Sequence, residues 1–141
     1  MTKEIEKQLV RTALEYRKRA YAPYSNFKVG AALLAKNGTI YGGCNVENAA
    51  YTPSNCAERT AFFKAVSEEV KDFEAIAIFG GYDGGELKVC APCGVCRQVM
   101  AEFCDPDEFL IYIGTSESNY EPHTLREMFP FSFSPKELEK N

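Results

Sequence analysis

The sequence predicts an α/β protein in which helices cover both faces of one mixed β-sheet. After a first helix and a β-hairpin, apolar runs typical of buried strands alternate with segments of helical spacing. The chain has 141 residues and 45% hydrophobic residues, enough for one hydrophobic core but too few for a second recognition domain. We therefore expect residues 1–141 to form a single domain, a three-layer α/β/α sandwich.

The first half of the chain contains a helix and a hairpin. Apolar residues recur at helical spacing over residues 4–20, which predicts an amphipathic helix closed by Pro23. Residues 27–36 and 39–47 alternate as strands do, and Asn37-Gly38 between them is a strong hairpin signal.

Each of the two central helix patterns begins at a cysteine. We predict helices over 56–70 and 93–104, and buried strands over 73–80 and 108–115. Gly80-Gly81 is expected to end the first of these strands, and a short helix is expected from His123 onward.

Charge and hydropathy exclude several kinds of partner. Sixteen basic and twenty acidic residues give a net charge of −4, and no basic cluster forms a stripe along a phosphate backbone. A nucleic acid polymer is therefore disfavoured, and a small polar molecule fits better. No apolar run approaches a membrane span and no export signal opens the chain, so we expect no membrane and a cytoplasmic location.

Cysteine supplies the candidate metal ligands. A chain without an export signal is expected to keep its six cysteines reduced, which favours metal binding over disulfides. Cys56, Cys93 and Cys96 offer three thiolates, and three protein ligands leave the fourth tetrahedral position of Zn²⁺ open for water, as in catalytic sites. The single histidine, His123, lies apart from these motifs and is interpreted as a surface or packing residue.

Glu58 and Arg59, which follow Cys56 closely, carry the rest of the predicted chemistry. Glu58 stands close enough to reach zinc-activated water without ligating, as a proton shuttle must. Three thiolates overcompensate the charge of Zn²⁺, so Arg59 is expected to interact with a cysteine sulfur and draw negative charge from it. The common alternative is a solvated surface arginine. Cys90 leaves open a closed, structural four-cysteine site.

Four stretches in order carry a resemblance to a known family. They read APYSNFKVGAAL at 22–33, NVENA at 45–49, CAER at 56–59 and PCGVCRQ at 92–98. With these motifs the chain resembles the small, homotetrameric, zinc-dependent cytidine deaminases of nucleoside salvage, from Tyr21 almost to the C-terminus. The resemblance implies a five-stranded mixed sheet, one Zn²⁺ per subunit, and hydrolysis of cytidine and deoxycytidine to uridine and deoxyuridine with release of ammonia.

The resemblance also implies substrate contacts. Asn45 and Glu47 match the pair that binds the sugar hydroxyls, and as alternate residues of one strand we expect them to share a face. Phe27 matches the aromatic that packs on the pyrimidine, and Ala57 a residue whose backbone contacts the base. Phe133 matches an aromatic contributed to the site of a neighbouring subunit in the homotetramer.

Two other functions use the same cysteines. One is a related deaminase acting on a nucleoside antibiotic, which the Asn45 and Glu47 sugar motif disfavours. The other is a non-catalytic zinc-binding module. Incubation with cytidine distinguishes it from a deaminase, because a binding module leaves the ultraviolet absorbance of cytidine unchanged.

Overall fold

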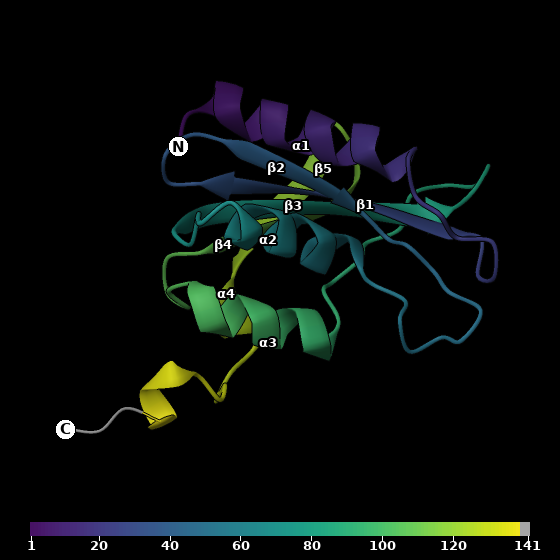
Figure 1. Cartoon of the computed structure of the whole chain (residues 1–141). Helices are drawn as coiled ribbons and strands as arrows, with labels where there is room; N and C mark the ends of the chain where they lie inside the picture. The colour runs from purple at the N-terminus through teal and green to yellow at the C-terminus, as the bar shows by residue number, and fades with distance from the viewer. Residues whose placement is uncertain (139–141) are drawn as a thin grey trace.

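The centre of the protein is one five-stranded sheet, seen in a computed structural model that describes residues 1–138 (Figure 1). Its strands lie in the order β2-β1-β3-β4-β5, where β1 is Phe27–Ala35, β2 Ile40–Cys44, β3 Phe73–Tyr82, β4 Leu110–Ser116 and β5 Asn119–Thr124. The pair β3 and β4 is parallel and the other neighbours are antiparallel. The predicted mixed five-stranded sheet is confirmed.

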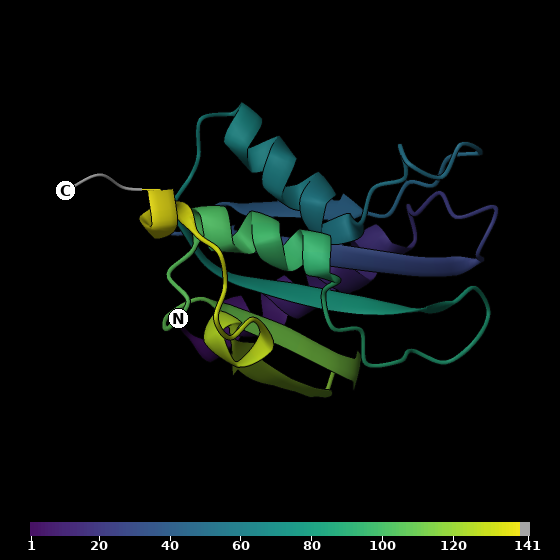
Figure 2. The same ribbon diagram turned by 90° about the horizontal axis from the view of Figure 1, so that it is seen from below.

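Helices cover both faces of this sheet. They are α1 (Lys3–Arg17), α2 (Ala57–Ser67), α3 (Gly94–Phe103) and the short α4 (Leu125–Met128), followed by a 3-10 turn, Pro135–Leu138. Helix α1 lies on one face, and α2, α3 and α4 lie on the other (Figures 1 and 2). Strand β1 serves both layers, because Leu33 packs in the core with α2 and α3, whereas Leu34 packs against α1. The predicted α/β/α sandwich is confirmed.

Helix α1 packs closely on β1 at a glycine. A Cβ placed on Gly30 would stand 2.0 Å from the carbonyl oxygen of Ala13, so a larger residue there would force the helix away. The helix ends at Arg17, and the predicted extension to residue 20 is wrong. The chain must turn here because the Tyr21 amide donates to the carbonyl of Asn45.

The predicted hairpin forms, but its second strand is shorter than expected. Gly38 takes the left-handed conformation (φ +93°) that the turn requires. Strand β2 ends at Cys44 instead of residue 47, because Val46 leaves the sheet to bridge Tyr21 and Asn55.

Strand β3 runs through the glycines that were expected to end it. It continues to Tyr82, since the missing side chains leave room for Cys90 beside Gly80 and for Glu86 and Leu87 beside Gly81. A Cβ on Gly81 would lie 2.4 Å from the carbonyl oxygen of Glu86.

Strand β5 is absent from the residue-by-residue prediction, which placed His123 in a helix. His123 belongs to β5, and the helix begins only at Leu125, after the Thr124 cap. The His123 ring lies between the carboxylates of Glu121 and Glu127, each at 3.2 Å. No helix in the described part of the chain has the length and apolarity of a membrane span.

Candidate metal centre and substrate cleft

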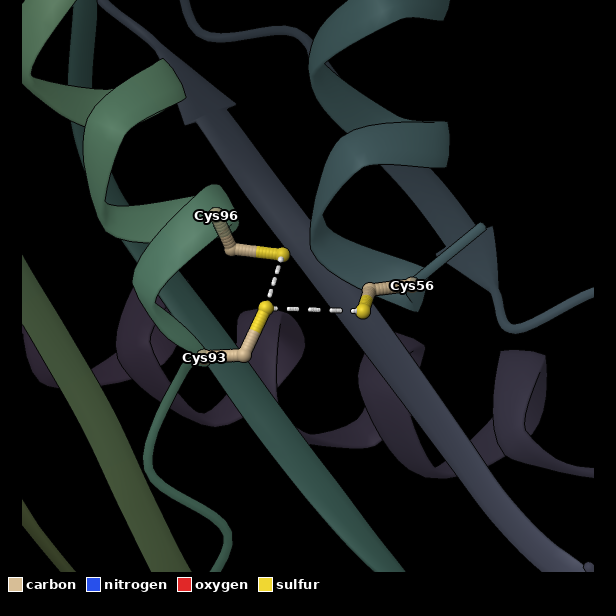
Figure 3. Close-up of side chains that lie close together, drawn as sticks. All are labelled: Cys56, Cys93 and Cys96. Carbon is tan, nitrogen blue, oxygen red and sulfur yellow. Dashed lines mark hydrogen bonds between the residues drawn. The ribbon is translucent and has the colours of Figure 1, made fainter. Parts of the chain in front are cut away.

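The three candidate metal ligands come together at the starts of two helices. Cys56 occupies the N-cap position of α2, Cys93 occupies that of α3, and Cys96 lies in the first turn of α3 (Figure 3). N-cap side chains commonly accept a hydrogen bond from the helix backbone. Neither cysteine does so, and both sulfurs turn toward the space between the helices.

The spacing of the sulfurs fits a tetrahedral zinc ion. The Sγ atoms of Cys56 and Cys93 are 3.7 Å apart, and those of Cys93 and Cys96 are 3.5 Å apart. All three lie within 4.8 Å of one another. Sulfurs bound tetrahedrally at 2.3 Å from Zn²⁺ stand about 3.8 Å apart, so little movement is needed to hold the ion.

Within the described residues, 1–138, the cluster of possible metal ligands does not include Cys90. Its sulfur instead donates to the carbonyl oxygen of Lys88 at 3.3 Å. The observed geometry therefore favours three cysteine ligands over a closed four-cysteine site, and leaves a tetrahedral position for water or substrate.

Arg59 contacts the cysteine cluster. Its Nη2 donates to Cys56 Sγ at 3.3 Å. Burial opposes the charge of the guanidinium, but its interactions with the sulfurs of Cys56 and Cys96 raise the pKa of Arg59. Hydrogen bonding with Cys96, and then with Arg59, outweighs burial and lowers the pKa of Cys56. Cys56 thus favours the thiolate, the form that binds metal, whereas the same hydrogen bond and burial raise the pKa of Cys96.

Glu58 is a buried carboxyl beside the cluster. It lies in the first turn of α2 and is 5% exposed, the one buried charged side chain in the described range. Burial, with a smaller contribution from Cys56, raises the pKa of Glu58 to about 7. A carboxyl with this pKa can both accept and donate a proton near neutral pH.

A mostly apolar cleft with a volume of about 380 Å³ lies beside the cysteine cluster and is lined by two of its members, Cys56 and Cys93. Of the predicted site residues it brings together Phe27, Asn45, Cys56, Ala57, Glu58 and Cys93. It also contains residues for which no role in the cleft is predicted, namely Val29, Ile78, Val89, Cys90 and Ala91. The last three precede Pro92 directly, and this closeness to a ligand motif is the signal that could have found them.

Asn45 closes the edge between β2 and β1. Its Oδ1 accepts from the Val29 amide at 2.9 Å, and its Nδ2 donates to the Phe27 carbonyl at 2.8 Å. The side chain thus continues the strand pairing by one step after β2 has ended, and holds Phe27 at the cleft.

Glu47 does not share a cleft with Asn45, contrary to the expectation of a common face. It lines a separate hollow with Tyr24 and Ser25, because the strand that would have aligned the pair ends at Cys44. The carboxylate accepts from the backbone amides of Tyr24 and Ser25, both at 3.0 Å, and from the Ser25 hydroxyl. The Ser25 hydroxyl makes the largest contribution to lowering the pKa of Glu47.

Phe133 lies outside the cleft of its own chain. Its ring is 55% exposed, and its carbonyl accepts from Gln98 Nε2 at 2.8 Å. The structure therefore brings the metal cluster, Glu58, Arg59, Phe27, Ala57 and Asn45 together, and leaves Glu47 and Phe133 apart from them.

Fold and site together define a class of protein. Three thiolates that leave one coordination position free, beside a buried carboxyl with a pKa near neutrality, are the elements of a hydrolytic zinc enzyme.

Comparisons with known proteins agree. Residues 3–112 match the family model described as the cytidine and deoxycytidylate deaminase zinc-binding region. The chain belongs to the cytidine deaminase family of zinc-binding hydrolases, and both its predicted membership and its zinc cofactor are confirmed.

Individual relatives match over almost the whole chain. The cytidine deaminase of Sporosarcina psychrophila is 47% identical over 135 residues, which are 96% of this chain and 95% of that protein. The cytidine deaminase of Halalkalibacterium halodurans is 44% identical over 130 residues, or 92% and 95% of the two chains. The crystal structure of cytidine deaminase from Burkholderia pseudomallei superimposes with a TM-score of 0.80 at 41% identity, covering 94% of this chain and all of that one.

Proposed function

We propose that the protein catalyses the hydrolytic deamination of cytidine and deoxycytidine to uridine and deoxyuridine, and that it serves pyrimidine salvage in the cytoplasm. The observation that supports this most strongly is the placement of Glu58, Phe27 and two of the candidate metal ligands, Cys56 and Cys93, in one cleft. An acid-base group, an aromatic surface and a metal centre are what hydrolysis of a pyrimidine amine requires.

Glu58 is the proposed proton carrier. Zinc bound by the three cysteines supplies the Lewis acidity that lets water ionise near neutral pH. Glu58 accepts the proton from the attacking water and delivers it to N3 of the base, which makes C4 electrophilic. The water oxygen bonds to C4, Glu58 passes the remaining hydroxyl proton to the amine, and the C4–N bond breaks to release ammonia. The buried setting that raises the pKa of Glu58 suits this double duty.

Phe27 and Ala57 are the proposed contacts of the base. Both line the cleft beside Glu58, and the Phe27 ring packs edge-on against Tyr82 with 5.1 Å between centroids. A ring fixed in this way offers the pyrimidine a flat apolar surface, and the start of α2 places the Ala57 backbone next to the metal ligands.

Asn45 and Glu47 are the proposed contacts of the sugar. Asn45 retains one amide N–H after its bond to the Phe27 carbonyl. Glu47 Oε1 accepts two backbone N–H groups and Oε2 accepts the Ser25 hydroxyl, which leaves one acceptor position on Oε2. A donor and an acceptor in reserve suit a hydroxyl, which both accepts and donates.

Arg59 is proposed to draw negative charge from the cysteine sulfurs, so that the metal centre remains a strong Lewis acid. The contact to Cys56 Sγ supports this role. Because the guanidinium keeps its charge at any working pH, its contribution does not depend on protonation.

We further propose a homotetramer in which Phe133 completes the site of a neighbouring subunit. The C-terminal segment runs past α3 (Figure 2). Phe131 and Phe133 in this segment are exposed, as are Phe63 on α2 and Val95 on α3. Exposed large apolar residues of this kind are the material of subunit contacts. Light scattering is expected to give four times the 15.8 kDa chain mass, and a monomer would contradict the shared site.

The proposed function is tested on zinc-loaded protein. Cytidine and deoxycytidine are incubated with the enzyme while ultraviolet absorbance is followed and zinc is quantified in the same sample. We expect both nucleosides to be converted, and free cytosine to react far more slowly because sugar-binding groups would be left unpaired. An unchanged cytidine spectrum at full zinc occupancy would refute the proposal and favour the zinc-binding module.

A further inference from the structure

A single hydroxyl, that of Ser25, links the proposed sugar contact to the proposed base contact. Ser25 Oγ donates to Glu47 Oε2 and accepts from the backbone amide of Phe27 at 3.0 Å. Its two hydrogen bonds thus connect the carboxylate of Glu47 to the backbone of Phe27, two residues that line separate hollows.

The backbone around Ser25 is shaped so that this link can form. Asn26 takes the left-handed conformation (φ 60°), which brings the Phe27 amide back over the Ser25 side chain. The Asn26 amide donates to the carbonyl of Ala22, and the Asn26 carbonyl accepts from the Asp83 amide, both at 2.9 Å. The turn is therefore fixed at both ends, by α1's exit segment and by the loop after β3.

Glu47 depends on Ser25 for its orientation. The amides of Tyr24 and Ser25 both bind Oε1, so they hold one oxygen and leave the carboxylate able to rotate about that point. The Ser25 hydroxyl holds Oε2, the oxygen with the acceptor position in reserve. Only with this third bond does the remaining lone pair point in a fixed direction.

We infer that Ser25 is a positioning residue that aligns Glu47 and Phe27 for nucleoside binding, because its hydroxyl donates to one and accepts from the other. The inference rests on the proposed function. It assigns Ser25 to substrate binding and not to proton transfer, since Ser25 does not line the cleft that holds Glu58. Loss of the hydroxyl should therefore weaken binding in the ground state and in the transition state alike.

The test compares three serine variants in zinc-loaded enzyme. Ser25→Ala is expected to raise KM for cytidine about tenfold with kcat within about twofold, the effect of losing one charge-assisted hydrogen bond. Ser25→Thr keeps a hydroxyl and is expected to restore KM to within about threefold of the unsubstituted enzyme. Ser67→Ala is the matched control, because its hydroxyl donates to the carbonyl of Lys64 in α2, away from the cleft, and it is expected to change neither constant.

A double-mutant cycle separates positioning from general stability. If Ser25 acts through Glu47, Ser25→Ala should raise KM by less than about twofold in a Glu47→Gln background. Zinc content and the urea midpoint are measured for every variant, and Ser25→Cys, a weaker donor, should give a KM between those of Ser25→Ala and Ser25→Thr.

The experiments give different results if the proposed function is wrong and if only the role of Ser25 is wrong. Unsubstituted, zinc-loaded enzyme that leaves cytidine unchanged would overturn the proposed function together with the role of Ser25. Active enzyme in which Ser25→Ala keeps the original KM, or in which its effect adds fully to that of Glu47→Gln, would overturn the role of Ser25 alone.

Discussion

Removal of the Asn45 side chain is expected to destabilise the protein as well as weaken substrate binding. Asn45→Ala deletes the bonds to the Val29 amide and the Phe27 carbonyl, at 2.9 and 2.8 Å. Each such bond contributes about 1 kcal/mol net, so we expect the free energy of unfolding to fall by about 2 kcal/mol. For a chain of this size the melting temperature should fall by about 4–8 °C.

Urea unfolding followed by circular dichroism measures this loss. All proteins are compared at one free zinc concentration, because bound metal adds to apparent stability. Asn119→Ala is the control, since that exposed side-chain amide donates to the hydroxyl of Thr115, and the unfolding free energy of this variant should change by less than about 0.5 kcal/mol. Equal midpoints for the Asn45 and Asn119 variants would refute the role of Asn45 as a clamp between β2 and β1.

Four further predictions concern the metal centre, the packing of α1 and a buried phenol. Glu58→Gln should lower kcat by about 10³-fold with zinc retained, as assayed by absorbance and metal analysis; near-native turnover would exclude a proton shuttle. Arg59→Gln should lower kcat/KM with zinc content unchanged, and equal kinetics would count against charge relief at the sulfurs. Gly30→Ala should cost about 1–3 kcal/mol in urea unfolding, because its Cβ would meet the α1 backbone at 2.0 Å; an unchanged midpoint would show that α1 shifts freely. Burial, with the Glu6 carboxylate adding to it, raises the pKa of Tyr112 to about 12 from 10. The contribution of Tyr112 to the free energy of unfolding should therefore be fully present below pH 10 and decline toward pH 12. Tyr112→Phe should flatten this decline, and an equal slope in both proteins would show that other groups cause it.

The sequence predicts best what short segments determine. The starts of α2 and α3 follow from helix patterns that begin at cysteines, and the turn at Gly38 follows from its Asn-Gly pair. Three of the helices and four of the five strands were located in this way, with ends that shifted by a few residues. The predicted helix starts carry all three cysteines, so these local patterns were enough to predict one metal cluster.

The errors have a different origin, which is pairing between distant segments. Strand β5 contains Pro122 and polar residues on both faces, so it has no strand periodicity, and only its place at the edge beside β4 makes it a strand. The position of Glu47 depends on the bridges of Val46 to Tyr21 and Asn55. No pattern within residues 45–49 contains that information.

The metal centre also sets an order on the assembly of the chain. Its first ligand, Cys56, precedes Cys93 by 37 residues, and strand β3 lies between them in the sequence. A chain emerging from the ribosome therefore cannot complete the zinc site until α3 has been made and has docked beside α2. Full three-cysteine coordination thus depends on the docking of these two helices, so that binding of the ion and folding of this part of the chain are coupled.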